Sequence, residues 1–400
     1  MTTLDTQAKL APERAKSARY GAFTRDGSHE LENQLAQICQ DTHAGVQSIV
    51  PAAKLEAILL GGGYGRGEGG VRETPAGDRP YNDLEFYVCL RGNDWVNERR
   101  YGEGIHALAE ELSPGAGVEV ELKLFSLGKL RRSPVSMFYY DLVMGHRWIL
   151  GGEKLLSGCE HHRDAHRIPL SEATRLLMNR CSGLLFAQER MQREPFTPDD
   201  ADFVARNLAK AQLAFGDVVL TAHGQYHWSC RERHQRLRRL MAGEDLPWLP
   251  EVLAHHFAGL NFKLHPRRTT LPAATLETQH RQLKTLALQV WLWLESRRLH
   301  HAFTSARDYA LTAINKCPET PPWRNGLVNL MTSGPGLLFD SGAWRYPRMR
   351  ILHALSLLLF EAAALSDPAL RQRLQRDLRT AATTRDDLMV AYQSLWHRFN

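Results

Sequence analysis

Polar and apolar positions follow two different periods along the chain. Up to about residue 156, the chain contains short stretches in which apolar and polar residues alternate one by one, a pattern that is typical of β-strands with one buried face. From Ser157 onward this alternation ends and apolar residues recur at helical spacing, for example behind an expected N-cap at Ser171 and behind Thr197-Pro198. The pattern predicts an α/β (α+β) domain with a small, mixed, mainly antiparallel sheet, followed by an all-helical region.

Breaks rich in proline and glycine divide the chain further. A leading helix is expected from about Glu30 to Val50. Whether the helical region forms one domain or two is left open by the sequence. The expected divisions are an N-terminal segment with the leading helix, the sheet domain and two helical domains, at residues 1–45, 46–156, 157–270 and 271–400.

Acidic residues gather on two of the predicted strands. In the stretch YNDLEFYV, the alternation places Asp83 and Glu85 on the same face. In the stretch GVEVELKLF, Glu119 and Glu121 both lie opposite the apolar face, so the alternation does not choose between them. Carboxylates that share a strand face can hold Mg²⁺, a hard cation that prefers oxygen ligands.

A glycine-rich turn, GGYGRGE, lies between a predicted strand at Leu55–Leu60 and the first acidic strand. Gly62 and Gly63 can bring backbone N–H groups close to phosphate oxygens, because no side chain blocks the approach. Arg66 either contacts a phosphate with two N–H groups or pairs with Glu68 in the same turn.

The order of strand, glycine turn and acidic strand resembles the DNA polymerase beta superfamily of nucleotidyltransferases over about residues 50–155. The turn is similar to that of the uridylyltransferases that modify the PII signalling protein. The stretch PYNDLE is similar to the acidic strand of the kanamycin-type aminoglycoside nucleotidyltransferases. The spacing between Gly63 and Asp83 is longer than is usual in the superfamily, and we interpret the extra piece, Gly69 to Arg79, as a flexible flap over the site.

The resemblance implies a Mg²⁺-dependent transfer of a nucleoside monophosphate from an NTP, expected to be ATP, to an acceptor, with release of pyrophosphate. On this basis Gly62 and Gly63 hold the triphosphate, while Asp83 and Glu85 bind the metal. Similarity around the following Phe-Ser pair favours Glu121 as the third catalytic carboxylate, acting as a metal ligand or as a general base.

Two basic features lie in the helical region. Lys210, on the helix expected after Thr197-Pro198, is a candidate for neutralising the triphosphate together with Arg66, and an ordinary exposed lysine is the alternative. The arginines between residues 231 and 239 are interpreted as a solvated helix face, because no aromatic residues alternate with them as stacking platforms for nucleic acid.

Composition narrows the class of protein without selecting the substrate. A net charge of +6 over 400 residues is compatible with an NTP, RNA or an acidic protein as partner, so a small molecule, a protein and an RNA end all stay open as acceptors. The six cysteines have no CxxC spacing, which argues against a disulfide framework and a zinc site. No apolar run reaches the roughly 20 residues that span a bilayer, and we expect a cytoplasmic enzyme without a membrane partner. The alternative is a regulatory protein of the same fold that binds an NTP without turnover.

Overall fold

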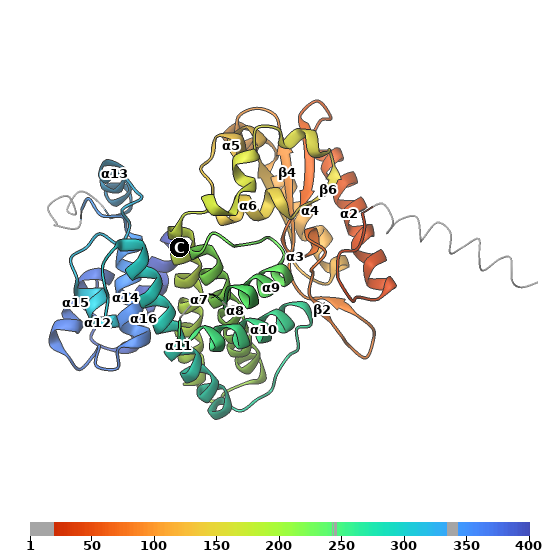
Figure 1. Ribbon diagram of the computed structural model, residues 1–400. Helices are drawn as coiled ribbons and strands as arrows, with labels where there is room; N and C mark the ends of the chain where they lie inside the picture. The colour runs from red at the N-terminus through yellow and green to blue at the C-terminus, as the bar shows by residue number, and fades with distance from the viewer. Residues whose placement is uncertain (1–19, 242, 244–245, 334–342) are drawn as a thin grey trace, which may run out of the picture. The chain divides into compact units, whose positions relative to one another are not determined.

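The computed structural model describes residues 20–241, 243, 246–333 and 343–400 (Figure 1). Within this part the chain forms two compact units. The first unit holds the residues up to Pro169 together with two later segments, His223–Arg236 and Leu260–Arg268. The second unit holds Leu170–Ala222, Leu237–Gly259 and the residues from Thr269 onward.

The first unit is built around a mixed sheet of four strands. The spatial order is β5-β4-β1-β6, with β4 and β5 parallel and β1 antiparallel to both β4 and β6. Two further short strands, β2 and β3, pair as a hairpin. The strands are β1 (Leu55–Leu60), β2 (Val71–Arg72), β3 (Arg79–Pro80), β4 (Leu84–Leu90), β5 (Val120–Phe125) and β6 (Arg147–Leu150).

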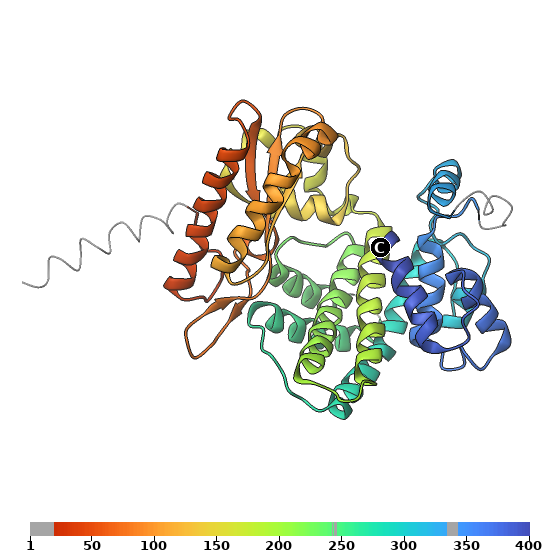
Figure 2. The same ribbon diagram turned by 180° about the vertical axis from the view of Figure 1, so that it is seen from behind.

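Helices cover both faces of the sheet. Helices α2 (His29–Ile49) and α4 (Asp94–Ala116) run side by side and share an apolar core with one face, where the side chain of Phe86 is fully buried (Figures 1 and 2). The opposite face packs against α5 (Leu127–Arg132), α6 (Met137–Met144) and the 3₁₀ turn η1 (Glu153–Leu156). Each such apolar side chain contributes about 1.5–3 kcal/mol to folding by leaving water.

Local signals explain where the covering helices begin and end. Helix α2 begins after Ser28, whose hydroxyl accepts a hydrogen bond from the Leu31 N–H at 3.4 Å, and α4 begins after Asn93, which caps it in the same way. Helix α4 ends at Gly117, which adopts the left-handed conformation at φ 71°. Two further 3₁₀ turns, η2 (Glu160–Arg163) and η3 (Ala165–Arg167), complete the main segment of this unit.

The second unit is helical and has one large apolar core. Helices α9 and α10 are each divided between the two units. The helices that lie wholly or partly in the second unit are α7 (Leu170–Met191), α8 (Pro198–Ala222), α9 (Cys230–Met241), α10 (Leu249–Leu264), α11 (Ala273–Leu299), α12 (Ala306–Leu311), α13 (Pro322–Ser333), α14 (Arg348–Phe360), α15 (Pro368–Leu378) and α16 (Arg385–Phe399).

The coarse fold predicted from the sequence is confirmed: a small mixed sheet with helices, followed by a helical region. The strand at Leu55–Leu60 is confirmed, and the leading helix runs over His29–Ile49. The prediction of Ser171 as an N-cap is wrong, because α7 already begins at Leu170. The second unit contains residues on both sides of position 270, where the sequence suggests a boundary.

Two chemical expectations can also be compared with the described residues. All six cysteines are free thiols and all are buried. None of the helices in the described part of the chain combines the length and the apolar character needed to cross a membrane.

Buried His353 in the second unit gives a prediction about pH. Its Nδ1 accepts a hydrogen bond from the Arg373 guanidinium at 2.6 Å, and Asp377 lies 3.3 Å away. Burial lowers the pKa of His353 to about 4, although the negative charge of Asp377 acts to raise it. As the pH falls below 6.5, the ordinary pKa of histidine, residue 353 therefore binds a proton in the unfolded chain before it does so in the folded protein. We expect the free energy of unfolding to decrease between pH 6.5 and pH 4, and to be unaffected by this group above that range.

Urea unfolding at pH 7 and pH 5 measures this effect. The difference between the two pH values should be smaller in His353→Gln than in the unaltered protein, since glutamine does not titrate. An equal difference in both proteins would show that another group causes the loss.

Candidate active site

The parallel pairing of β4 with β5 brings the predicted acidic residues together. Glu85 pairs with Glu121 in the register, and the Leu84 N–H donates to the Glu119 carbonyl at 2.9 Å. Asp83 and Glu119 therefore precede their strands at the same level of the sheet. One carboxylate oxygen each from Asp83, Glu119 and Glu121 lies within 4.8 Å of the others. We call these three residues the carboxylate cluster.

The carboxylate cluster has the donor set that a hard divalent cation prefers. Asp83 and Glu119 are exposed and Glu121 is half-buried, so the three oxygens face solvent rather than the core. Glu121 also forms an ion pair with Lys123. Three like charges at this distance repel one another, and a Mg²⁺ ion bound by their oxygens would relieve the repulsion.

Glu85, predicted as the second metal ligand, lies outside the carboxylate cluster. Its Oε2 accepts a hydrogen bond from the Tyr87 hydroxyl at 2.9 Å. Burial and the charge of Glu85 raise the pKa of Tyr87, so this hydroxyl stays protonated and remains the donor. The other oxygen, Oε1, lies beside Gly62, where an added Cβ would come within 3.1 Å of it. The Glu85 carboxylate thus contacts the Tyr87 hydroxyl and lies beside the glycine turn.

The glycine turn folds as one short helical turn, α3 (Gly62–Gly65), directly after β1. Tyr64 fixes the turn from inside the protein: its side chain is fully buried, its hydroxyl donates to the Gly70 carbonyl at 2.8 Å and accepts from the Tyr81 N–H at 2.9 Å. Burial raises the pKa of Tyr64 to about 12. A Cβ added at Gly63 would contact the Glu68 carbonyl at 3.1 Å, so Gly63 permits close packing of the turn on itself. The alternation of polar and apolar residues contains no signal for this role of Tyr64.

Gly62→Ala is expected to destabilise the first unit by about 1–2 kcal/mol, because Gly62 adopts φ 60°, which an L side chain disfavours, and the new Cβ would press on Glu85. Chemical denaturation measures the change. Gly152→Ala is the control, since Gly152 has extended backbone and open space around a Cβ. Equal stability of the two variants would contradict the close approach of Gly62 to Glu85.

Arg66 does not pair with Glu68, one of its two predicted partners. Its guanidinium forms an ion pair with Asp141 of α6 at 3.0 Å, and Asp141 also accepts from the Tyr226 hydroxyl at 3.1 Å. Glu68 instead accepts hydrogen bonds from the Ser229 hydroxyl at 2.6 Å and the Cys230 N–H at 2.9 Å, at the first turn of α9. A carboxylate at a helix N-terminus is stabilised by the unpaired N–H groups and the helix dipole.

The interpretation of the α9 arginines as a solvated face is wrong for Arg233. This side chain is 4% exposed, donates to the Tyr226 hydroxyl at 2.6 Å and lies over the Tyr226 ring at 4.9 Å. Burial lowers the pKa of nearby Lys263, and the charges of Arg66 and Arg233 lower it further. The first unit therefore concentrates three cations behind the glycine turn. The sequence could not indicate this grouping, because Arg66 lies more than 150 residues before Arg233 and Lys263.

A small cavity lies between the glycine turn, β4 and α6. It measures about 140 Å³ and is lined by Gly62, Arg66, Glu85 and Tyr87, with α6 residues completing the wall. The cavity therefore places a buried cation and a carboxylate beside the glycine turn. It is large enough for part of a ligand and smaller than a whole nucleotide site.

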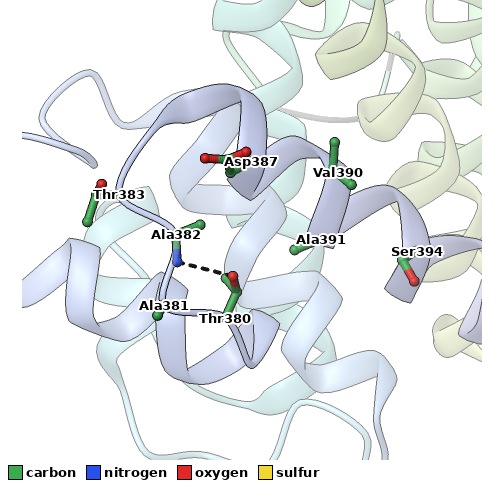
Figure 3. Close-up of a pocket in the computed structure, with 8 residues that line it drawn as sticks. All are labelled: Thr380, Ala381, Ala382, Thr383, Asp387, Val390, Ala391 and Ser394. Carbon is green, nitrogen blue, oxygen red and sulfur yellow. Dashed lines mark hydrogen bonds between the residues drawn. The ribbon is translucent and has the colours of Figure 1, made fainter.

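The remaining predicted site residue, Lys210, lies on α8 in the second unit. It is exposed and lines a separate cavity between α7, α8 and α16. Another hollow of the second unit, at the connection of α15 to α16, is lined mainly by small side chains (Figure 3). There the Ala382 N–H donates to the Thr380 hydroxyl at 3.1 Å, and Asp387 is engaged in capping α16. This hollow offers little chemistry for a ligand.

Comparisons with protein-family models, with curated proteins and with solved structures found no significant match. The resemblance to the polymerase beta superfamily therefore stays a hypothesis based on the residues themselves. A function is argued below from the carboxylate cluster and from the glycine turn that lies beside Glu85.

Proposed function

We propose that this protein is a Mg²⁺-dependent nucleotidyltransferase, which moves a nucleoside monophosphate from an NTP, expected to be ATP, to an acceptor and releases pyrophosphate. The observation that carries the proposal is the carboxylate cluster, in which Asp83, Glu119 and Glu121 bring oxygens within 4.8 Å of one another. Such a set is suited to a divalent cation that accompanies nucleotide phosphates. A single exposed acid would not support the same proposal.

Two neighbouring features support a phosphate-bearing substrate. The glycine turn lies next to Glu85, which belongs to β4, the strand that begins directly after Asp83. Gly62 has no side chain that would obstruct a ligand there. Arg66 lines the adjoining cavity and carries a positive charge that Asp141 holds in place. Arg66 is in this proposal a contact for a phosphate oxygen or a positioning residue for the turn.

The transfer would break one bond and form one bond at the α-phosphorus. The acceptor oxygen attacks this phosphorus, the bond to the bridging oxygen breaks, and pyrophosphate leaves with the electron pair. The proton of the acceptor hydroxyl passes to a carboxylate, for which Glu119 and Glu121 are the candidates. A bound Mg²⁺ would supply charge neutralisation, and the protein's own contribution is to hold the reacting groups in position.

Incubation with each α-labelled NTP, Mg²⁺ and a panel of acceptors tests the proposal, with transfer of the label to the acceptor and release of pyrophosphate as the two readouts. The panel should contain small hydroxyl and amino compounds, proteins and RNA ends. Glu119→Gln and Glu121→Gln in the same assay separate the two candidates for the third carboxylate. Tight NTP binding without turnover on any acceptor would instead support the regulatory alternative.

A further inference from the structure

The small cavity beside the glycine turn has one exposed side chain in its wall. Its volume of about 140 Å³ can hold only part of a ligand the size of a nucleotide, so the rest of such a ligand lies outside, on the rim. Among the lining residues, which all belong to the described part of the chain, Phe138 is the one exposed side chain, at 40%. A ligand that enters beside Gly62 therefore extends toward solvent past the Phe138 ring.

The position of Phe138 follows from the way α6 begins. Ser136 caps this helix, because its hydroxyl accepts a hydrogen bond from the Tyr139 N–H at 3.1 Å. Residues three and four apart lie on the same side of a helix, so Phe138, Asp141 and Leu142 share the face that lines the cavity. Phe138 is thus presented by a capped helix rather than by a loop.

Other aromatic rings hold the Phe138 ring in place. Its centroid lies 5.7 Å from that of Tyr87 and 5.3 Å from that of Tyr139. Phe125, at the end of β5, contacts the same two rings with centroid distances of 5.6 and 6.4 Å. We call these four residues the aromatic wall. Tyr87 is buried, and Phe125 and Tyr139 are half-buried, so Phe138 is the part of the aromatic wall that a ligand can reach.

The neighbours of Phe138 give its exposure a chemical meaning. Single exposed apolar side chains are common on protein surfaces and need no explanation by themselves. Phe138 differs because it lines the same cavity as Gly62 and Arg66, which are the candidates for contacting phosphate. Every nucleobase has a flat face that can pack on an aromatic side chain. The cavity therefore has a surface for a planar group beside a surface for phosphates.

We propose that Phe138 binds the base of the NTP by packing its ring against the flat face of the base, while the phosphates lie at the glycine turn. The inference rests on the proposed function for the identity of the ligand. It requires that the NTP binds, and it does not require turnover. Phe138 contributes in this way to the affinity for the donor rather than to the chemical step.

Calorimetric titration of the whole protein with each NTP and with inorganic tripolyphosphate tests the proposal, in the presence of Mg²⁺ and without an acceptor. Tripolyphosphate has the phosphates of an NTP but no base. Phe138→Ala is expected to weaken NTP binding by about 5- to 100-fold and to leave tripolyphosphate binding unchanged. Phe138→Tyr should bind the NTP as the unaltered protein does. Phe138→Leu should bind it more weakly, because leucine keeps the apolar character and loses the flat ring.

Phe257→Ala is the matched control. It removes the same type of side chain from another exposed position, since Phe257 is 52% exposed and does not line the cavity. This variant should bind the NTP with unchanged affinity. Circular dichroism checks that each variant is folded.

Three outcomes would overturn the proposal. Phe138→Ala could bind the NTP as the Phe257→Ala control does, and a raised KM for an acceptor would then assign the ring to the acceptor instead. Phe138→Ala could also lose NTP and tripolyphosphate binding equally, which would show that the ring acts through the shape of the cavity. Finally, the unaltered protein could bind no NTP, which would overturn the proposed function as well.

Failure of the proposed function alone gives a different result. NTP binding that depends on Phe138, without transfer to any acceptor, would refute the transfer reaction and support the role of the ring. Transfer together with NTP binding that does not depend on Phe138 would refute only the role of the ring.

Discussion

Asp83→Asn is expected to reduce nucleotidyl transfer by about 10²–10³-fold or more while leaving the fold intact. Asparagine has nearly the same volume, but it loses the negative charge and one of the oxygens that converge with those of Glu119 and Glu121. Removing one of three like charges also relieves repulsion, so the free energy of unfolding should not decrease. Pyrophosphate release measures the first effect and chemical denaturation the second.

Asp94→Asn provides the control for this substitution. Asp94 is an exposed aspartate in the first turn of α4, outside the carboxylate cluster. It should retain full transfer. Unchanged transfer in Asp83→Asn would refute the metal-ligand role, and a loss of stability together with activity would indicate that Asp83 acts through the fold.

Several strands and helices were predictable because their signals are local. A mainly apolar run followed by glycines was sufficient to locate β1, and the Thr197-Pro198 pair was sufficient to locate the start of α8. Ser171 shows the limit of such signals. A serine near a helix start is common both at the cap and in the first turn, and the sequence alone does not separate the two positions.

The carboxylate cluster was predictable only in part. Alternation identified the faces of both acidic strands, but it could not show that β4 and β5 are neighbours, parallel and in the register that sets Glu85 against Glu121. It also could not separate Glu119 from Glu121, because residues two apart share a face. The structure brings both of them to Asp83, whereas Glu85 faces Gly62.

The charged contacts behind the glycine turn were beyond local reasoning. Arg66 had an acidic neighbour in sequence, Glu68, yet each finds its partner far along the chain. Arg233 looked like its exposed neighbours in α9 because nothing in a charged helix marks the one side chain that a distant segment covers. Ion pairs of this kind depend on tertiary packing, for which a single sequence holds no periodic signal.

Glu295→Ala is expected to destabilise the second unit by about 3–5 kcal/mol, the largest stability effect that we predict. The carboxylate of Glu295 is fully buried and accepts hydrogen bonds from Thr174 of α7 at 2.6 Å, from Tyr309 of α12 at 2.7 Å and from Arg298 at 2.7 and 2.8 Å. It therefore ties α11 to two other helices. Its removal would leave the Arg298 guanidinium, whose side chain is 5% exposed, without its buried partner. The hydroxyls of Thr174 and Tyr309 would lose their acceptor.

Glu319→Ala is the control for Glu295→Ala, because it also removes a carboxylate that pairs with Arg298. Glu319 also pairs with Arg298, at 2.6 Å, but its side chain is 39% exposed. Water can replace an exposed partner, so this variant should lose no more than about 1 kcal/mol. Urea denaturation followed by circular dichroism gives both values. Comparable losses in the two variants would mean that Arg298 is held mainly by other contacts, such as its hydrogen bond to the Lys316 carbonyl at 2.7 Å, and that Glu295 is not the centre of the network.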